Sequence, residues 1–567
     1  MKKNIFVKGA VTLMVAAGLS SCASDYLERA PISYEDENRI NSSTETAQKA
    51  AWGVCRSMYF GYNIASRIQF MNGEPWINTM YGEVYAQDAY YTLWQDFSKD
   101  FMDGRYLLQT NYWMTWMPWM YSYNLIAQSN KILDAIDKAE GPQADREYIK
   151  AQLLTIRSHA YTKLLQFYAP RWEDSNNGET LCICLRETYS TGNEPLSSMN
   201  TIHTVVNRDL DEAIRLFDKC GKNRTKIYEP DASIAHGIKA RLALIFHDWD
   251  TALEHATLAR QDYPIMSSDE YLAGFNTPND EWMWSNALEL EDQYLGTITW
   301  GGQYACNGGY VYSWGYGAGA INIDLYNQMD PNDTRRALYW TPDKKLPVIL
   351  KPAYFWNPAY TDELTMNMNV KTGNGSPTGM AIQLKKFANE ALPARGISYF
   401  QVQAYRNSGD PEGELVGIVP FGAQFKFWGA GPFSGTSFPF MRASEMAFIE
   451  AEAACHKNLE DRARKALEEV NGNRIPGYTC TKSGDDLLEE VYLSRRIELW
   501  GEGFAWTDLK RLNRPSVRRA WKANDPTSGN IPPAFAGTVL PSDINGWRIS
   551  LPDAEVNYNS LIQKYSH

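Results

Sequence analysis

The segment that decides the fold is residues 234–256, IAHGIKARLALIFHDWDTALEHA. Its first half repeats large apolar residues with the period of one helix face, namely Ile234, Ile238, Leu242 and Ile245. The sequence His247-Asp248-Trp249 interrupts this pattern, and a second periodic run with Ala252, Leu253 and Ala256 follows it. The segment therefore predicts two helices joined by a short turn, which forces them to run antiparallel.

A second segment repeats this design further along the chain. Two periodic runs are separated by a break at Asn458 and end at Asn471-Gly472, with apolar positions at Met446, Ile449, Ala453, Ala463, Leu467 and Val470. Small alanine side chains on both runs allow two helices to approach closely. Such antiparallel pairs resemble the tetratricopeptide unit.

Longer helices are predicted on both sides of these pairs. Residues 143–169 carry a helical stripe that Pro170 ends, because proline cannot continue a helix. A further helix is expected from about 485 to 500. Three tryptophans spaced by three, Trp113, Trp116 and Trp119, predict a stripe for helix packing rather than a binding platform.

The middle of the chain, residues 266–440, has a different composition. It is rich in Gly, Pro, Asn and aromatic residues and lacks the helical period, so it predicts loops with a few short strands. We therefore expect a mainly α fold in which tetratricopeptide-like helix pairs form a scaffold, interrupted by a large loop-rich insertion. A single domain, 41–567, would consist of a scaffold at 41–265 and 441–514, the insertion at 266–440, and a closing tail at 515–567.

The N-terminus has the pattern of an export signal. Lys2, Lys3 and Lys8 precede an apolar stretch, which ends in the tetrad Leu19-Ser20-Ser21-Cys22. This tetrad resembles a bacterial lipoprotein signal, in which residues 1–21 are removed and Cys22 becomes the lipidated first residue. The alternative is an ordinary secretory signal with a chance cysteine. Residues 22–40, acidic after Cys22, then read as a flexible tether.

Composition limits the classes of partner. The net charge of -12 and the absence of a basic stripe argue against nucleic acid, whose phosphates need clustered Lys and Arg. The 19 Trp, 34 Tyr and 21 Phe are the unusual feature, since such rings suit amphipathic ligands as well as cores. The spacing of the other seven cysteines indicates neither a disulfide framework nor a zinc site, and we expect mostly buried free thiols.

Several motifs occur in order along the chain. Residues 494–503, SRRIELWGEG, are followed by DLKR at 508–511. Upstream lie RASEMAFIEAEA at 442–453, DPNDTRR at 330–336, SHAYTKLLQFYAP at 158–170, and a Trp119, Tyr123, Asn124, Asn130 pattern. In this combination the chain resembles the SusD/RagB family. One departure is Ala505, where the family often has Arg, and we expect it to affect local stability more than binding.

The resemblance implies a surface-exposed, outer-membrane lipoprotein with four tetratricopeptide-like helix pairs, attached to the membrane through its lipid only. It implies a SusC-like TonB-dependent transporter as partner, capture of oligosaccharide or polysaccharide, and no catalysis. Peptide capture, as in some members, is the first alternative. A glycoside hydrolase and a tetratricopeptide scaffold without a small ligand are further alternatives.

Glycan capture needs aromatic rings for the apolar face of a sugar and polar groups for its hydroxyls. Two segments have this composition, one around residues 72–94 and one around residues 300–316. The candidate ligand contacts are Trp76, Tyr81 and Trp94 in the first, and Trp300, Tyr304, Asn307, Trp314 and Tyr316 in the second. Either cluster could instead pack against the transporter or against the helices.

Other chemistry has little support. The chain lacks the His-Glu-x-x-His, Gly-x-Ser-x-Gly, Walker and dinucleotide motifs, so we predict no catalytic residue, no cofactor and no metal ligand. Asp330, Asn332 and Asp333 could hold calcium, but capping of a polar turn is the favoured role.

Overall fold

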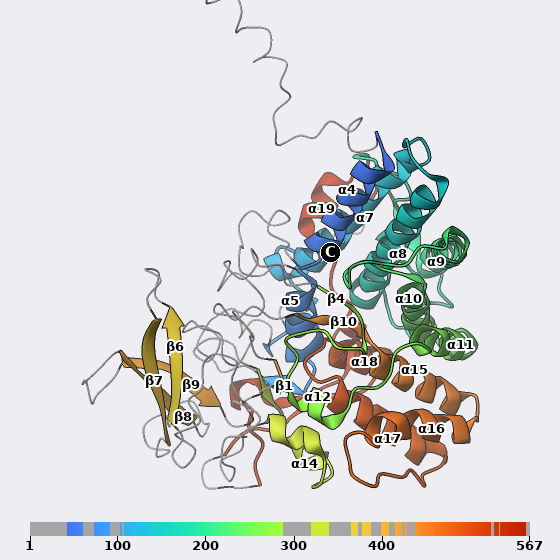
Figure 1. Cartoon of the computed structure of the whole chain (residues 1–567). Coiled ribbons are helices and arrows are strands. Elements are labelled where there is room, and N and C mark those ends of the chain that lie inside the picture. Colours follow the sequence, from blue (N-terminus) through green and yellow to red (C-terminus); the bar gives the residue numbers. More distant parts are fainter. Residues whose placement is uncertain are drawn as a thin grey trace, which may run out of the picture.

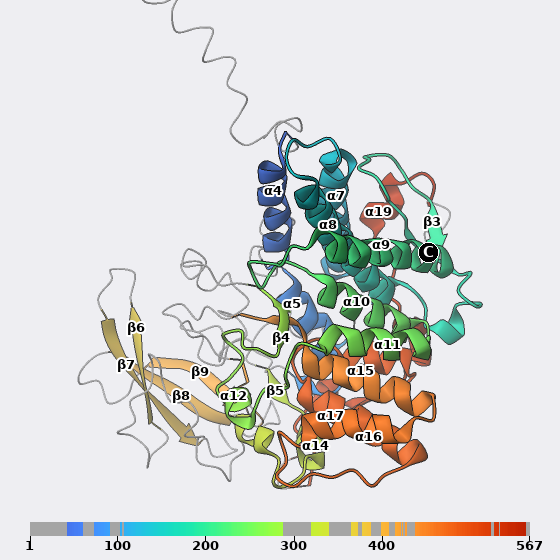
Figure 2. The same ribbon diagram turned by 45° about the vertical axis from the view of Figure 1, so that its right-hand side comes forward.

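The structure is a computed structural model. It describes residues 42–59, 73–90, 102–104, 107–286, 319–339 and 437–562 except 523, 524, 526 and 532, with residues 422, 424, 426 and 427 and the backbone of four strands between 365 and 420. Figures 1 and 2 show a stack of helices with a separate sheet drawn to one side. The predicted signal peptide, Cys22 and the tether lie outside the described residues.

Helices form the scaffold, as the sequence predicts. The principal helices are α4 (Thr44–Ser57), α7 (Trp113–Ile136), α8 (Gln143–Tyr168), α9 (Met199–Cys220), α10 (Ala232–Ile245), α11 (Trp249–Arg260), α15 (Ala443–His456), α16 (Glu460–Asn471) and α17 (Gly484–Glu498). Neighbours in this order pack on one another, and α11 packs on α15 although the whole insertion separates them in sequence. The scaffold is therefore continuous across the insertion (Figure 2).

Both predicted helix pairs are confirmed, with their turns at the predicted breaks. His247 has a φ of 54°, and the side chain of Asp248 accepts a hydrogen bond from Thr251 N at 3.2 Å to begin α11. Asn458, with a φ of 57°, makes the corresponding turn between α15 and α16. Both turns use the left-handed region, in which asparagine and histidine are over-represented.

Two tryptophans of the predicted stripe, Trp116 and Trp119, pack against the core of the scaffold, as predicted. The ring of Trp119 is 5% exposed and meets Tyr168 edge to face with centroids 5.0 Å apart. Trp116 is partly buried against the same core. In the part of the chain that the structure describes, no helix is long and apolar enough to cross a membrane.

The insertion contains more regular strand than predicted. Four antiparallel strands form a meander in the order β6 (Thr365–Lys371), β7 (Pro377–Lys386), β8 (Tyr399–Arg406) and β9 (Glu414–Pro420). The expectation of a few short strands is wrong for this stretch, whose period of two was overlooked. In β8, for example, Phe400, Val402 and Ala404 alternate with Gln401 and Gln403.

Short elements connect the insertion to the scaffold. They are α5 (Glu74–Thr79), the π-helix η2 (Met80–Val84), β1 (Ala89–Tyr90), α12 (Ser268–Leu272), β4 (Trp282–Ser285), β5 (Ala320–Ile321), α14 (Ile323–Gln328), η7 (Thr334–Leu338) and β10 (Pro439–Arg442). Asp333 caps η7 through its bond to Arg335 N at 2.9 Å, which is the predicted turn role. Among the described residues no group of three side chains is placed to hold a metal.

The tail closes back on the scaffold through short elements. These are α18 (Ala505–Arg511), β11 (Ser516–Arg518), η11 (Pro533–Phe535), β12 (Gly537–Val539), η12 (Pro541–Asp543), η13 (Asn545–Trp547) and α19 (Asp553–Tyr558). Ile549 N donates to Phe167 O at 3.0 Å, and Asp553 N donates to Thr110 O at 3.0 Å. The six cysteines that the structure describes are free thiols.

Candidate functional site

Two short strands in or next to the two aromatic-rich segments pair with each other. Strand β1 pairs antiparallel with β5, with Ala89 opposite Ile321 and Tyr90 opposite Ala320. The first segment continues from Tyr90 toward Trp94, and the second arrives at β5 from Trp314 and Tyr316. The structure therefore pairs Tyr90, which belongs to the first segment, with Ala320, which lies four residues after the second. We call the β1–β5 pair the root.

Hydrogen bonds between its own flanking residues and with two other parts of the chain fix the root. The carbonyl of Asp88 accepts from Trp500 Nε1 at 2.7 Å and from Asn322 N at 2.9 Å. The side chain of Asn322 donates to Gln87 O at 2.7 Å. Ile321 N donates to Gly422 O at 2.9 Å. Because nearly every bond here is buried, the root is a rigid support for the segments it carries.

The carboxylate of Asp88 adds an ion pair from the scaffold. Arg496 of α17 donates to it through Nη2 at 2.6 Å and Nε at 2.9 Å. This bidentate geometry fixes the orientation of the carboxylate and compensates its charge. Nearby, burial and the charge of Asp88 raise the pKa of Glu83 to about 8. Oε1 of Glu83 accepts from Gly503 N at 2.7 Å, which joins η2 to the turn before α18.

A fully buried charge network lies behind the root. It contains four acidic and four basic side chains, namely Glu281, Asp333, Glu498, Glu502, Arg335, Lys426, Arg442 and Arg474. Burial alone would raise the pKa of Glu498, but Arg474, Arg442 and Arg335 hold it well below its ordinary value. Lys426 Nζ donates to the carbonyl of Trp500 at 2.8 Å. The network therefore positions the tryptophan whose indole holds the root.

Two of the predicted ligand contacts are core residues in this structure. Trp76 is 3% exposed and Tyr81 is fully buried, with ring centroids 6.0 Å apart in an edge arrangement. The hydroxyl of Tyr81 donates to Met114 O at 2.6 Å. Neither ring is open to a ligand in this structure, in contrast to the interpretation from sequence. Their segment forms a short helix and π-turn that insert into the scaffold, where the sequence suggested loop.

The remaining candidates lie outside the described residues. These are Trp94, Trp300, Tyr304, Asn307, Trp314 and Tyr316. Sequence reasoning missed the residues that support them, above all Asn322 and Arg496, which carry no local signal of that role. Asp88 was visible as a polar neighbour of the first cluster, but its partner is distant in sequence.

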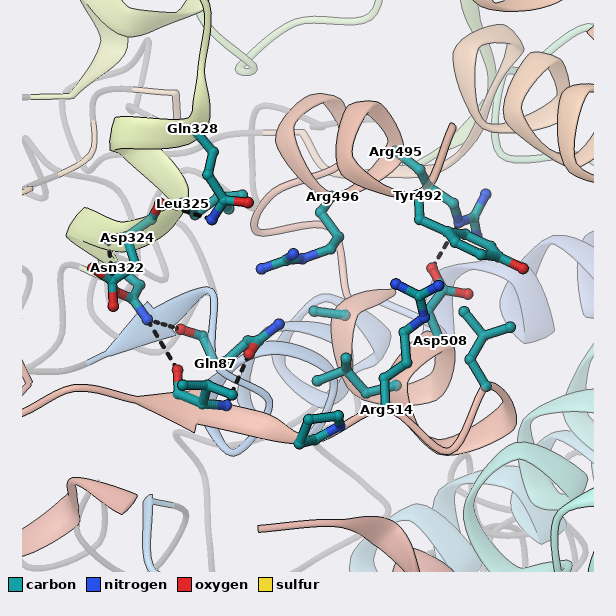
Figure 3. A pocket seen from close by; sticks show the side chains of 15 residues that line it. Gln87, Asn322, Asp324, Leu325, Gln328, Tyr492, Arg495, Arg496, Asp508 and Arg514 are labelled. Atoms are coloured by element: carbon teal, nitrogen blue, oxygen red, sulfur yellow. Dashed lines mark hydrogen bonds and ion pairs between the residues drawn. The ribbon is translucent and has the colours of Figure 1, made fainter. Parts of the chain in front are cut away.

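A cavity of about 330 Å³ lies beside the root (Figure 3). Gln87 and Asn322 form its wall on the root side, and α14, α17, α18 and β11 supply the other walls. In Figure 3, Arg496 reaches across the cavity from α17 and Arg514 points in from the segment after α18. Most of the exposed lining surface is apolar, although polar and charged side chains also contribute to the walls.

Comparisons with known proteins agree with this architecture. The model of the SusD family matches residues 429–564. The C-terminal part of the chain therefore matches the SusD family, in agreement with the resemblance of its motifs. The match covers α15 to α19, including the helix that carries Arg496 and Glu498. A search of curated proteins found no match.

Solved structures extend the SusD-like fold to most of the chain. A SusD-like carbohydrate binding protein from Bacteroides vulgatus has a TM-score of 0.68 at 20% identity, covering 92% of this chain and 98% of its own. A SusD superfamily protein from Bacteroides thetaiotaomicron has a TM-score of 0.64 at 17% identity, covering 91% and 98%. A putative sugar binding protein from Bacteroides vulgatus has a TM-score of 0.61 at 18% identity, covering 91% and 97%. At these identities the likeness concerns the fold.

Proposed function

We propose that this chain is a glycan-binding lipoprotein of the outer-membrane surface, which captures oligosaccharide or polysaccharide and delivers it unchanged to a SusC-like TonB-dependent transporter. The match of residues 429–564 to the SusD family supports this function. Two structures of the same fold are described as a carbohydrate binding protein and a putative sugar binding protein. Cys22, lipidated after removal of residues 1–21, would anchor a single domain through the acidic tether.

The observation that carries the proposal is the root. Trp94 lies four residues after Tyr90, and Trp314 lies six residues before Ala320. Since a chain spans at most about 3.4 Å per residue, Trp94 stays within roughly 14 Å of Tyr90 and Trp314 within roughly 20 Å of Ala320. Those two strand residues pair directly. Rings from segments distant in sequence therefore start from one place on the scaffold, which supports their action on one sugar chain.

The expected affinity suits transfer to a transporter. Burial of about 50–60 Å² of apolar ligand surface on one ring contributes roughly 1–1.5 kcal/mol. Two or three rings then give micromolar to millimolar affinity, after the cost of association is included. A ligand held this weakly dissociates fast enough to be passed on intact.

The test is calorimetric titration of the chain without residues 1–22 against plant, host and microbial polysaccharides. For the best ligand, Trp94→Ala and Trp314→Ala should each weaken binding by about five- to tenfold, equivalent to one stacked ring. Tyr189→Ala is the matched control, because Tyr189 is a 44% exposed ring on the scaffold. Wild-type affinity in both tryptophan variants would remove these rings from the site.

Further measurements separate the alternatives. Binding of peptides but of no polysaccharide would favour peptide capture, and release of reducing ends from a bound polysaccharide would favour hydrolysis. Flat titrations with every ligand would favour a protein scaffold. Radiolabelled fatty acid should enter the wild-type chain and not Cys22→Ala, and purification of the lipidated chain from outer membranes should recover the transporter.

A further inference from the structure

The cavity beside the root has the construction of a small-ligand site. Its volume of about 330 Å³ lies at the lower end of the range of about 300–1,000 Å³ that is typical of ligand pockets. Its apolar walls are formed by Leu325, Ala505, Leu509, Leu512, Pro515 and Val517. Apolar walls with a few polar groups are the pattern of sites that hold small organic molecules.

The charged groups of the lining are already paired with opposite charges. Arg495 pairs with Asp508, which also lines the cavity, at 2.7 Å. Arg496 pairs with Asp88 at 2.6 Å. Two further pairs join lining residues to partners outside the cavity, Arg514 with Glu489 and Asp324 with Arg519. An ionic ligand would meet no uncompensated charge, so the electrostatics favour a neutral one.

In the part of the chain that the structure describes, three lining side chains nevertheless keep hydrogen-bonding atoms without a partner. Gln87 accepts through Oε1 from Val517 N at 2.8 Å, so its Nε2 retains both donors. Arg496 uses Nε and Nη2 for Asp88, which leaves Nη1. Gln328 donates through Nε2 to Asp324 O, which leaves Oε1 as an acceptor. These three side chains come from three different walls of the cavity (Figure 3).

We propose that this cavity is a second site, separate from the aromatic segments, that holds a single neutral sugar ring. A pyranose has hydroxyls that accept from Gln87 and Arg496 and donate to Gln328, and a C–H face that fits the apolar wall. The choice of a sugar among neutral polyhydroxylated ligands rests on the proposed function. The size and the neutrality of the ligand are inferred from the cavity alone.

Titration with monosaccharides tests the site, because a single ring gains little from an extended aromatic surface. The probes are the methyl pyranosides of glucose, galactose, mannose and xylose, with methyl glucuronide as the anionic match. At least one neutral glycoside should bind the wild-type chain with a millimolar dissociation constant by saturation-transfer NMR and calorimetry. The glucuronide should bind more weakly, because its carboxylate must lose water without gaining a free cation.

Variants distinguish the cavity from the aromatic segments. Ala505→Leu fills the cavity without changing charge and should weaken monosaccharide binding by about tenfold or more. Gln328→Ala should weaken it severalfold, whereas Asn327→Ala, its neighbour on α14 outside the lining, should not. Trp314→Ala should leave it unchanged. Thermal unfolding of each variant reports whether the fold is intact.

Three results would overturn the proposal. They are the failure of every neutral glycoside to bind at millimolar concentration, tighter binding of the glucuronide, or wild-type binding by Ala505→Leu. Loss of the monosaccharide in Trp314→Ala alone would assign it to the aromatic segments. Titration of Ala505→Leu with polysaccharide distinguishes the cavity site from the proposed function. Polysaccharide binding by this variant tests the aromatic segments, because the substitution affects only the cavity.

Discussion

The buried charge network makes a quantitative prediction through Glu498. This carboxylate is fully buried and accepts from Arg335 Nη1 at 2.8 Å, Arg442 Nη1 at 2.9 Å and two nitrogens of Arg474 at 3.0 and 3.1 Å. Glu498→Gln preserves the shape of the side chain and removes its charge. Four buried cations then face three carboxylates, and the amide nitrogen of the new side chain points a donor at other donors.

The magnitude follows from the burial of every partner. Breaking a buried ion pair by neutralising one member costs about 3–5 kcal/mol, because the remaining charge stays desolvated. Glu498 serves three guanidinium groups, so we expect the upper half of that range. For a protein whose free energy of unfolding is typically about 5–15 kcal/mol, this is a large share of the total.

Urea unfolding followed by both tryptophan fluorescence and circular dichroism measures the effect, and agreement between the two probes tests for a two-state transition. Glu212→Gln is the control, since Glu212 pairs with Arg215 on an exposed face of α9, where such pairs are worth under about 1 kcal/mol. The double variant Glu498→Gln with Arg474→Met restores the balance to three of each sign. It should lose less than the sum of the single variants, by at least about 1 kcal/mol.

A loss in Glu498→Gln no greater than in Glu212→Gln would refute the reasoning. It would show that water or local rearrangement compensates the remaining cations, so that the network adds no net stability. Additive losses in the double variant would refute the narrower claim that charge balance is what matters.

Three further predictions concern single groups. The pKa of Glu83 is about 8 in the folded chain, whereas its ordinary value is 4.5. The free energy of unfolding should therefore decline as pH rises from about 4.5 to about 8. Thermal melts of Glu83→Gln should show a weaker decline. His236 and His255 share a 2.7 Å Nδ1–Nδ1 contact, and burial lowers the pKa of each to about 4. Stability should therefore fall as pH drops from about 6.5 to about 4, less steeply in His236→Gln. Gly503→Ala should cost about 2 kcal/mol or more, because φ is 98° and a Cβ would lie 2.5 Å from Asn78. Gly477→Ala, at a φ of 74° with open space, should cost about 1 kcal/mol.

The sequence predicts the scaffold because its helices depend on local signals. The apolar period and the left-handed breaks at His247 and Asn458 are both visible in the printed residues, and the structure follows them. Helix α9 had an equally clear pattern, with Ile202, Leu210 and Leu216 buried, and was overlooked. The apolar period in the sequence is therefore sufficient to predict α9 as well.

The root could not be predicted in the same way. Strands of two residues carry no period, and the pairing of Ala89 with Ile321 depends on contacts from Trp500 and Arg496. The burial of Tyr81 has the same origin, because a ring with polar neighbours in sequence is read as exposed until its neighbours in space are known.

The positions of the network and the root show that most of the recognisable motif supports the backbone next to the aromatic segments. In SRRIELWGEG, Glu498 and Glu502 are buried in the charge network, Trp500 donates to the carbonyl of Asp88, and Arg496 holds the carboxylate of the same residue. Each of these side chains acts on the backbone from which the aromatic segments extend. A support that the scaffold fixes in this way allows the aromatic residues next to it in sequence to be exchanged without disturbing the scaffold. Under the proposed function, selectivity for a polysaccharide should therefore change with residues 91–101 and 287–318, while the motif stabilises the backbone from which these residues continue.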